Sequence, residues 1–133
     1  MNAERKPIIL VIDDDSALVR LMRFYLEREG FEVRVAEDGE QALQAFEQTQ
    51  LPDLVILDVM LPYHNGHELL ADLRARSAWA NVPVILLSSS DLENDVVKGL
   101  SAGANDYLAK PFRPAEVVAR IRNLLEIAAK ARQ

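Results

Sequence analysis

Short apolar runs alternate with longer amphipathic segments along the 133-residue chain. The runs have the length of β-strands and are rich in Val, Ile and Leu. They lie at Ile8–Ile12, Glu32–Ala36, Leu54–Leu57, Val84–Leu87 and Asp106–Ala109. Three of them are apolar throughout, which is typical of parallel strands that are covered by helices on both faces.

The segments between these runs carry apolar residues at helical spacing. These residues are Leu18, Leu21, Met22, Tyr25 and Leu26 in the first segment, Ala42, Ala45 and Phe46 in the second, Leu69, Leu70 and Leu73 in the third, Val96, Val97 and Leu100 in the fourth, and Val117, Ile121, Leu124, Leu125 and Ala128 in the fifth.

Residues that begin and end helices flank several of these segments. Asp15 or Ser16 can cap the first helix, and Gly30 can end it in the left-handed conformation. Asn65-Gly66 is a turn signal before the third helix. We expect Asp91 to cap the fourth helix and Gly103 to end it.

The order of strand and helix repeats five times, which predicts an α/β fold with a doubly wound five-stranded parallel sheet. Right-handed crossovers would place five flanking helices on its two faces. We expect one domain over residues 1–133, with a core of about 7–126. Residues 127–133 fit an extension of the last helix, or a linker to an effector that this chain lacks.

Composition narrows the class of protein. The net charge of −6 argues against direct nucleic-acid binding, which needs a basic face. Cysteine is absent, so no disulfide framework forms, which suits a cytoplasmic protein. No apolar run approaches the roughly 20 residues of a membrane span. We therefore expect a cytoplasmic protein without membrane contact.

Polar residues follow the predicted strands where each strand ends. Asp13 and Asp14 follow the first strand, Asp58 the third, Ser88 the fourth and Lys110 the fifth. In doubly wound sheets ligands bind outside these carboxyl ends. We therefore expect carboxylates, a hydroxyl and an ammonium group to meet at one edge of the sheet.

This set of groups points to phosphoryl chemistry. Clustered carboxylates repel unless a cation neutralises them, and hard oxygen ligands without histidine or cysteine suit Mg²⁺. A carboxylate can attack phosphorus and form an aspartyl-phosphate. The chain has no glycine-rich nucleotide-binding loop, so we expect the phosphoryl group to come from a partner.

Four pieces of the sequence match one known family in order and spacing. They are IILVIDDDS at residues 8–16, LVILDVMLP at 54–62, PVILLSS at 83–89 and GANDYLAKPF at 103–112. Each is modest evidence alone, but together they span nearly the whole chain and are highly specific. On these residues the chain resembles the receiver domain of two-component response regulators, a chemotaxis-regulator-like superfamily with a flavodoxin-like fold.

The resemblance implies a phosphorylation site. Asp58 would accept a phosphoryl group from a sensor histidine kinase or a histidine phosphotransfer protein. Mg²⁺, with Mn²⁺ as a substitute, would be bound directly by Asp14 and Asp58 and through water by Asp13. The backbone carbonyl of Met60 would be a further ligand.

The resemblance also implies a conformational switch. Lys110 would pair with the phosphate, and Ser88 holds the position of the switch hydroxyl. Tyr107 holds the position of the aromatic residue whose ring turns inward when that hydroxyl moves. The Lys110–Pro111 bond is usually cis in the family. Phosphorylation would then alter the surface that a downstream effector protein or domain recognises.

The loop after the third strand departs from the family pattern. It reads Leu61-Pro62-Tyr63-His64-Asn65-Gly66, where the family often has acidic residues before its glycine. Tyr63 and His64 would alter partner contacts or access to the site. Met60 is apolar and cannot orient an attacking water. We therefore expect slow self-dephosphorylation.

Simpler roles exist for some of these residues. Asp13 and Asp14 could cap the first helix, although Asp15 suffices for that. Ser89 or Ser90 could make the contact that we assign to the first serine of that run. Tyr107 could be an ordinary half-buried strand aromatic.

Four charged residues on the fourth helix, fifth strand and fifth helix suggest a homodimer. They resemble the pairs through which winged-helix transcription-factor regulators dimerise when phosphorylated. The residues are Lys98, Asp106, Glu116 and Arg120. Ordinary solvated charge is the simpler alternative, because exposed ion pairs contribute little.

The sequence thus predicts a Mg²⁺-dependent phosphorylation switch in two-component signal transduction. It would promote its own phosphorylation and dephosphorylation without being a free-standing enzyme. One alternative is a phosphorylation-independent interaction module on the same fold. Another is an aspartate-dependent phosphatase, which the apolar Met60 disfavours because such enzymes place a second aspartate there.

Overall fold

The computed structural model of the protein describes residues 5–89 and 93–132. One five-stranded parallel sheet has the strand order β2-β1-β3-β4-β5. Its strands are β1 (Ile8–Ile12), β2 (Glu32–Ala36), β3 (Leu54–Asp58), β4 (Val84–Ser88) and β5 (Asp106–Ala109). The predicted flavodoxin-like α/β fold is confirmed. β3 and β4 each run one residue further than predicted and include Asp58 and Ser88.

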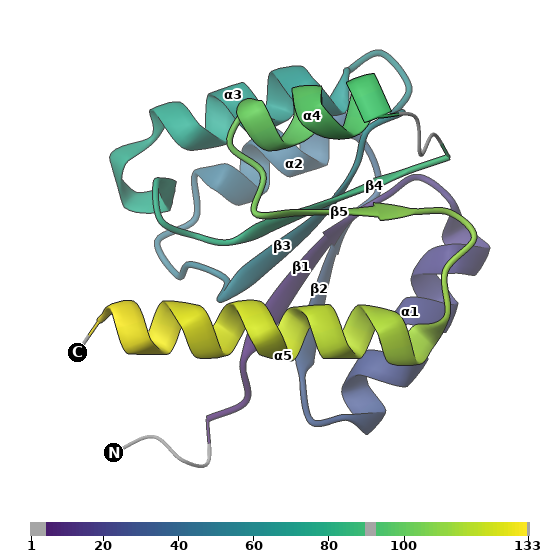
Figure 1. Ribbon diagram of the computed structural model, residues 1–133, viewed down its shortest axis with the longest axis vertical. Coiled ribbons are helices and arrows are strands. Elements are labelled where there is room, and N and C mark those ends of the chain that lie inside the picture. The colour runs from purple at the N-terminus through teal and green to yellow at the C-terminus, as the bar shows by residue number, and fades with distance from the viewer. Residues whose placement is uncertain (1–4, 90–92, 133) are drawn as a thin grey trace.

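Helices cover both faces of the sheet (Figure 1). They are α1 (Ser16–Arg28), α2 (Gly39–Phe46), α3 (Gly66–Ala75), α4 (Glu93–Ser101) and α5 (Pro114–Ala131), with a short 3₁₀ helix at Ser77–Trp79. α1 and α5 lie on one face, and α2, α3 and α4 lie on the other. The three central strands β1, β3 and β4 are buried along their whole length, as their apolar composition predicts.

Two apolar cores fill the space between the sheet and its helices. The core under α1 and α5 contains Met22, Leu26 and Ile121. The core under α2 and α3 contains Phe46 and Trp79, whose rings meet edge to face at 5.1 Å. Alternating side chains of the central strands therefore supply both cores.

Several predicted helix boundaries are confirmed. The Asp15 carboxylate accepts from the backbone N–H groups of Ala17 and Leu18 and caps α1. Gly30 follows α1 with φ 94°, and Gly103 follows α4 with φ 112°. Asn65 is the N-cap of α3. Asp91, the expected cap of α4, lies outside the described residues.

The helical spacing of apolar residues predicted the buried faces of α1 and α4 only in part. Leu21 on α1 is exposed, and so are Val97 and Leu100 on α4. In α4 the buried position is Gly99, where an added Cβ would lie 2.8 Å from the Leu86 side chain. The helix lies so close to the sheet there that glycine, rather than a large apolar residue, occupies the contact.

Arg74 joins the segments at the end of the sheet where the strands begin. Its guanidinium donates to the carbonyls of Gly103 (3.0 Å) and Val82 (2.7 Å) and to Asn105 Oδ1 (2.8 Å). It also reaches the carbonyls of Trp79 and Ala80. None of the described helices is long and apolar enough to cross a membrane.

Candidate functional site

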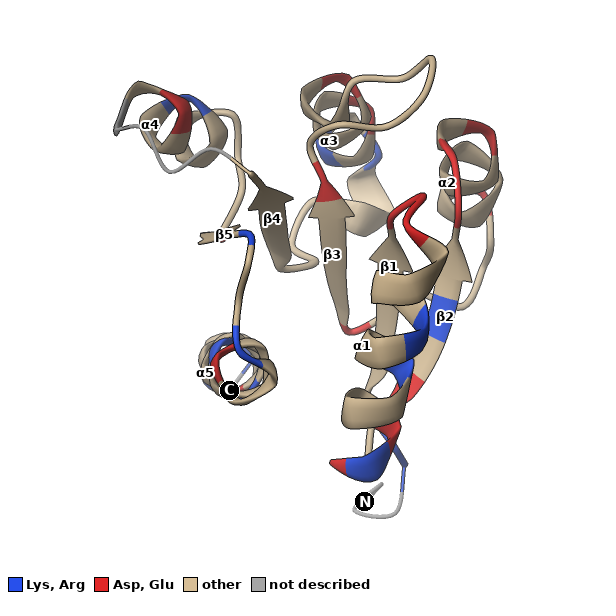
Figure 2. Cartoon of the chain, turned by 90° about the vertical axis from the view of Figure 1, so that its right-hand side faces the viewer, with Lys and Arg blue, Asp and Glu red and all other residues tan. Residues whose placement is uncertain are grey.

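Three carboxylates meet at the carboxyl edge of the sheet. Asp13 and Asp14 lie in the turn after β1, and Asp58 ends the neighbouring strand β3. One oxygen from each lies within 4.8 Å of the others. Figure 2 shows the acidic turn after β1 beside the acidic tip of β3. The predicted convergence is therefore confirmed for these residues.

Asp13 is fully buried and Asp14 is exposed. Asp13 is fixed from two sides, because its N–H donates to the Ala36 carbonyl at 3.1 Å and its Oδ1 accepts from the Asp15 N–H at 2.9 Å. The adjacent Asp14 carboxylate is thereby left at the surface, where it can reach a cation. Asp13 and Asp14 thus differ in burial. The simpler role of capping α1 belongs to Asp15.

Lys110, the residue after β5, places a positive charge at this edge. Its Nζ donates to Asp58 Oδ2 at 3.0 Å and to Asp13 Oδ2 at 3.2 Å. Its backbone N–H donates to the Ser88 carbonyl at 2.7 Å, and the peptide bond to Pro111 is cis, as the family resemblance implies. Burial lowers the pKa of Lys110, but the hydrogen bonds and charges of Asp58 and Asp13 outweigh it and raise that pKa overall.

The pKa of Asp13 is raised to about 6. Burial is the main cause, and the nearby charge of Asp58 adds to it, whereas the Asp15 N–H and Lys110 work in the opposite direction. Three carboxylates and one ammonium group meet here, so Lys110 alone does not balance the negative charge. A cation bound at this edge would relieve that imbalance.

The donor set fits a hard divalent cation. The cluster offers carboxylate oxygens only, without histidine or cysteine, which is the chemistry that Mg²⁺ prefers. Asp58 Oδ1 accepts from the Met60 N–H at 3.0 Å, so the backbone of Met60 is held against the same carboxylate.

The remaining predicted site residues lie on β4 and β5. Ser88 is buried at the end of β4 and pairs in register with Ala109, next to Lys110. Tyr107 is half-buried on β5, and its ring lies beside Gly99 of α4, at 3.2 Å from the position of an added Cβ. Ser90, one of the alternatives to Ser88, lies outside the described residues.

The loop after β3 contains two features that the sequence did not reveal. Tyr63 adopts φ 65°, in the left-handed region, with a fully exposed side chain. His64 packs its ring onto the backbone of Gly39 at the start of α2, where even a methyl group would overlap it. The one sequence signal for this contact was Gly39, because a residue without a side chain permits another group to approach its backbone closely.

The four charged residues of the expected dimer face are placed on α4, β5 and α5. Arg120 donates to Asp106 at 2.8 Å and to Glu116 at 3.2 Å within the chain. Lys98 is exposed on α4. Intrachain pairing thus accounts for three of these charges in the structure.

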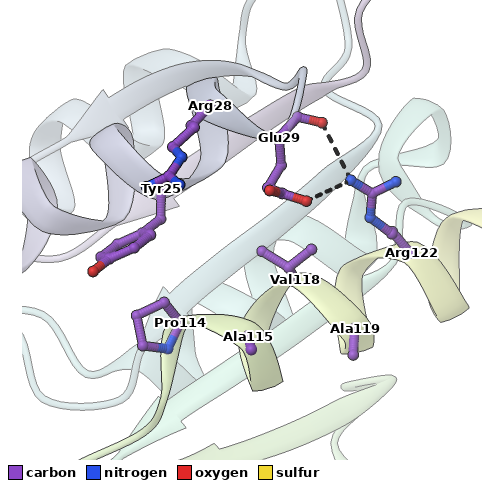
Figure 3. Close-up of a pocket in the computed structure, with 8 residues that line it drawn as sticks. All are labelled: Tyr25, Arg28, Glu29, Pro114, Ala115, Val118, Ala119 and Arg122. Atoms are coloured by element: carbon purple, nitrogen blue, oxygen red, sulfur yellow. Dashed lines mark hydrogen bonds and ion pairs between the residues drawn. The ribbon is translucent and has the colours of Figure 1, made fainter.

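A separate cavity of about 420 Å³ lies between α1 and α5. Pro114, Ala115 and Val118 form an apolar side, and Arg122 donates to Glu29 at 2.9 Å beside it (Figure 3). The cavity shares no residue with the carboxylate cluster.

The fold and the acidic edge define a doubly wound α/β protein of the receiver-domain class. The chain belongs to the response regulator receiver domain family, whose model matches residues 9–122. It is a receiver domain of the kind found in two-component response regulators.

Similar proteins agree with this assignment. The alkaline phosphatase synthesis transcriptional regulatory protein PhoP of Bacillus subtilis is 47% identical over 124 residues, which cover 91% of this chain and 50% of PhoP. The chain thus spans about half the length of the curated relatives that it matches.

Solved structures share the fold. A CheY-like receiver domain protein from Methanospirillum hungatei has a TM-score of 0.87 at 28% identity, over 96% of this chain and 99% of that one. The receiver domain of the sensor histidine kinase PA1611 from Pseudomonas aeruginosa has a TM-score of 0.83 at 31% identity, over 92% and 99% of the two chains. That receiver domain has a magnesium ion coordinated in its active-site cleft.

Proposed function

We propose that Asp58 accepts a phosphoryl group from a phosphohistidine of a sensor histidine kinase or a histidine phosphotransfer protein. A carboxylate oxygen of Asp58 attacks phosphorus, the P–N bond breaks, and the histidine leaves with an acyl phosphate remaining on Asp58. One observation carries this proposal. Asp58 stands at the ligand-binding edge of the sheet with Lys110 Nζ 3.0 Å away and two further carboxylates beside it.

We propose Mg²⁺ as the cation of this site, with Mn²⁺ as a substitute. Asp14 and Asp58 would bind it directly, Asp13 through water, and Met60 through its backbone carbonyl. When bound, the cation neutralises charge on the phosphoryl oxygens. The oxygen-only cluster supports this choice, as does the magnesium ion of the PA1611 receiver domain.

Lys110 and Ser88 would hold the transferred group. Lys110 already contacts Asp58, so its ammonium can follow the added negative charge at little cost in reorganisation. Ser88 would bond the phosphate, and Tyr107 would move inward with it. Phosphorylation then shifts an existing equilibrium between two conformations and changes the surface around α4 and β5. The close packing of Tyr107 against α4 supports this route.

The partners follow from this chemistry. One is the phosphohistidine donor, and the other is a downstream effector protein or domain. PhoP is by its name a transcriptional regulatory protein, so we propose an output of that kind, with nucleic acid contacted by the effector rather than by this acidic chain. The match to residues 9–122 supports a single receiver domain with a core of about 7–126.

We further propose that phosphorylation promotes a homodimer through Lys98, Asp106, Glu116 and Arg120. The intrachain bonds of Arg120 would exchange for bonds across the interface. Light scattering with and without beryllofluoride and Mg²⁺ tests this. A dimer that forms only with the phosphoryl mimic and is lost in Arg120→Ala supports it, and a monomer under both conditions contradicts it.

Intact-mass spectrometry after incubation with acetyl phosphate tests the central proposal. We expect one phosphoryl adduct that requires Mg²⁺ and is lost in Asp58→Asn. Asp15→Asn is the matched control, because asparagine caps α1 equally well while one nearby charge is removed. Absence of an adduct on a folded, Mg²⁺-binding protein would favour the phosphorylation-independent module. Turnover of phosphate monoesters would favour the phosphatase.

A further inference from the structure

The loop between β3 and α3 is attached by one end to Asp58 and by the other end to Val59, the residue that follows it. At the first end the Met60 N–H donates to Asp58 Oδ1 at 3.0 Å. At the second end the Gly66 N–H donates to the Val59 carbonyl at 2.8 Å. An added Cβ on Gly66 would lie 2.5 Å from the Asp58 carbonyl, so the start of α3 sits directly against the backbone of the acceptor.

The middle of this loop is attached to a different element. The His64 ring packs onto Gly39, the first residue of α2, which is buried. His64 Nε2 also lies 3.7 Å from Glu40 Oε1. The side chain of His64 is 28% exposed, so most of it is covered in the folded protein.

The contact links the two halves of the acidic cluster. Gly39 lies three residues after Ala36, whose carbonyl accepts from the Asp13 N–H at 3.1 Å. The segment that fixes Asp13 on one side therefore supports the His64 ring on the other. Through this ring the loop that follows Asp58 is held to the start of α2, three residues after the Ala36 carbonyl of β2 that orients Asp13.

The neighbouring residue shows that the loop needs such an attachment. Tyr63 has φ 65°, a left-handed conformation that is strained for a residue other than glycine. Its own side chain is fully exposed and cannot offset this strain. Such conformations persist only where the surrounding contacts determine them, and His64 makes the adjacent contact.

We propose that His64 is a positioning residue for the divalent-cation site. Its ring on Gly39 holds the loop that carries Met60, whose backbone N–H contacts Asp58 and whose carbonyl would be a ligand of the cation. This inference rests on the proposed function, because it assumes a cation at the acidic cluster. It concerns the packing of the ring and does not depend on the protonation of His64.

Mg²⁺ titration followed by amide NMR tests the proposal on the intact chain. We expect His64→Ala to bind Mg²⁺ roughly three- to tenfold more weakly. This loss is at or below the roughly tenfold lower limit for residues that directly support metal ligands. His64→Phe keeps a planar ring over Gly39 and should stay within about twofold of the wild type. His67→Ala is the matched control, because this second histidine lies on α3 and faces α4, near Asp95 and Lys98.

Gly39→Ala tests the contact from the other side. Its methyl group would take the place of the ring, so we expect weaker Mg²⁺ binding similar to that of His64→Ala. The variant that carries both Gly39→Ala and His64→Ala should bind Mg²⁺ no more weakly than His64→Ala alone, because the methyl group then has no ring to displace. Urea unfolding identifies any variant whose loss of affinity merely follows loss of fold.

A second readout separates positioning from chemistry. With acetyl phosphate, His64→Ala should be phosphorylated slowly at low Mg²⁺ and at the wild-type rate when Mg²⁺ saturates the site. If the wild type itself binds no Mg²⁺, the proposed function fails. If the wild type binds Mg²⁺ and folded His64→Ala binds it equally well, only the role of His64 is overturned. Equal weakness of His64→Phe and His64→Ala would overturn the packing argument.

Discussion

Lys110 and Asp58, which are 52 residues apart in sequence, form a hydrogen-bonded ion pair with Nζ 3.0 Å from Oδ2. The same ammonium lies 3.2 Å from the buried Asp13. One cation therefore partly balances two buried carboxylates in the absence of a metal ion. Removing one partner of such a pair leaves uncompensated charge.

Lys110→Met should therefore lower the free energy of unfolding at pH 7 in EDTA. We expect a loss of about 1–2 kcal/mol, less than the roughly 3–5 kcal/mol of fully buried pairs, because Lys110 is partly exposed. Urea denaturation measures this. Lys98→Met, which removes an exposed lysine from α4, should change stability by less than about 0.5 kcal/mol. Equal stabilities of the two variants would contradict the prediction.

Asp13→Asn should stabilise the metal-free protein at high pH. The pKa of Asp13 is raised from 3.8 to about 6 in the folded protein. Its favourable contribution is therefore present below about pH 4 and is lost as the pH rises through 6. The difference between 3.8 and about 6 corresponds to roughly 3 kcal/mol, of which the loss of the Lys110 contact offsets part.

We expect Asp13→Asn to be about 1–2 kcal/mol more stable than the wild type at pH 8. The advantage should disappear below pH 4, where Asp13 is protonated in both the folded and the unfolded state. Urea denaturation between pH 3.5 and 8 in EDTA gives the curve. An advantage that does not change across this range would rule out the ionisation of Asp13 as its cause.

Tyr63→Gly should stabilise the protein by about 0.5–1 kcal/mol. The left-handed φ of 65° costs tyrosine roughly 1–2 kcal/mol, and the greater freedom of glycine in the unfolded chain offsets part of the gain. Tyr63→Ala removes the same exposed ring but keeps the strain, so its stability should match that of the wild type. Thermal and urea unfolding of the three proteins settle the order.

Arg74→Met should be among the most destabilising single changes outside the two cores. It removes five hydrogen bonds, three of which are 3.0 Å or shorter. Asn105 Oδ1 and the Trp79 carbonyl keep the backbone N–H donors of Val84 and Val82, whereas the other three carbonyls lose their Arg74 donor. We expect a loss of about 3 kcal/mol or more, measured by urea denaturation. Arg23→Met should cost little, because Arg23 makes only long contacts of 3.4 and 3.5 Å.

Met60→Asn should shorten the lifetime of the phosphorylated protein. Met60 is 71% exposed, so the change costs little core packing, and an amide at that position can orient an attacking water. We expect loss of the adduct to be roughly tenfold faster, which is less than the 10²–10⁴-fold of a full general base. Mass spectrometry after removal of acetyl phosphate measures both rates. A wild-type half-life of only seconds would contradict the slow self-dephosphorylation expected from the sequence.

The sequence predicted the sheet and the acidic edge because both follow from local patterns. Apolar runs of strand length fix the strands, and the residue after each run must lie at the carboxyl edge. The faces of α1 and α4 were harder to predict. Leu21 and Leu100 are exposed although their spacing matches a buried stripe, because the crossing of each helix over the sheet decides which residues are covered.

Contacts between distant segments could not be predicted from patterns. Neither Arg74 nor His64 belongs to a local motif, and their partners lie on other elements of the fold. A single arginine or histidine in a sequence is usually solvated, so nothing marks it as a residue that joins segments. Tyr63 is similar, because its strain depends on a backbone angle that tyrosine does not favour.

The uniformly buried central strands have a consequence for how the fold is specified. A strand that is polar on one face is held in register by alternation, since a shift of one residue would turn its polar side inward. β1, β3 and β4 lack that safeguard along most of their length, because both of their faces are apolar until Asp58 ends β3 and Ser88 ends β4. A shift of β1 that moved Asp13 into the strand would instead take this buried carboxylate away from Lys110 and into the apolar layer, at a cost of several kcal/mol. Asp13 and Asp58 thus also help to fix the register of β1 and β3 in the sheet.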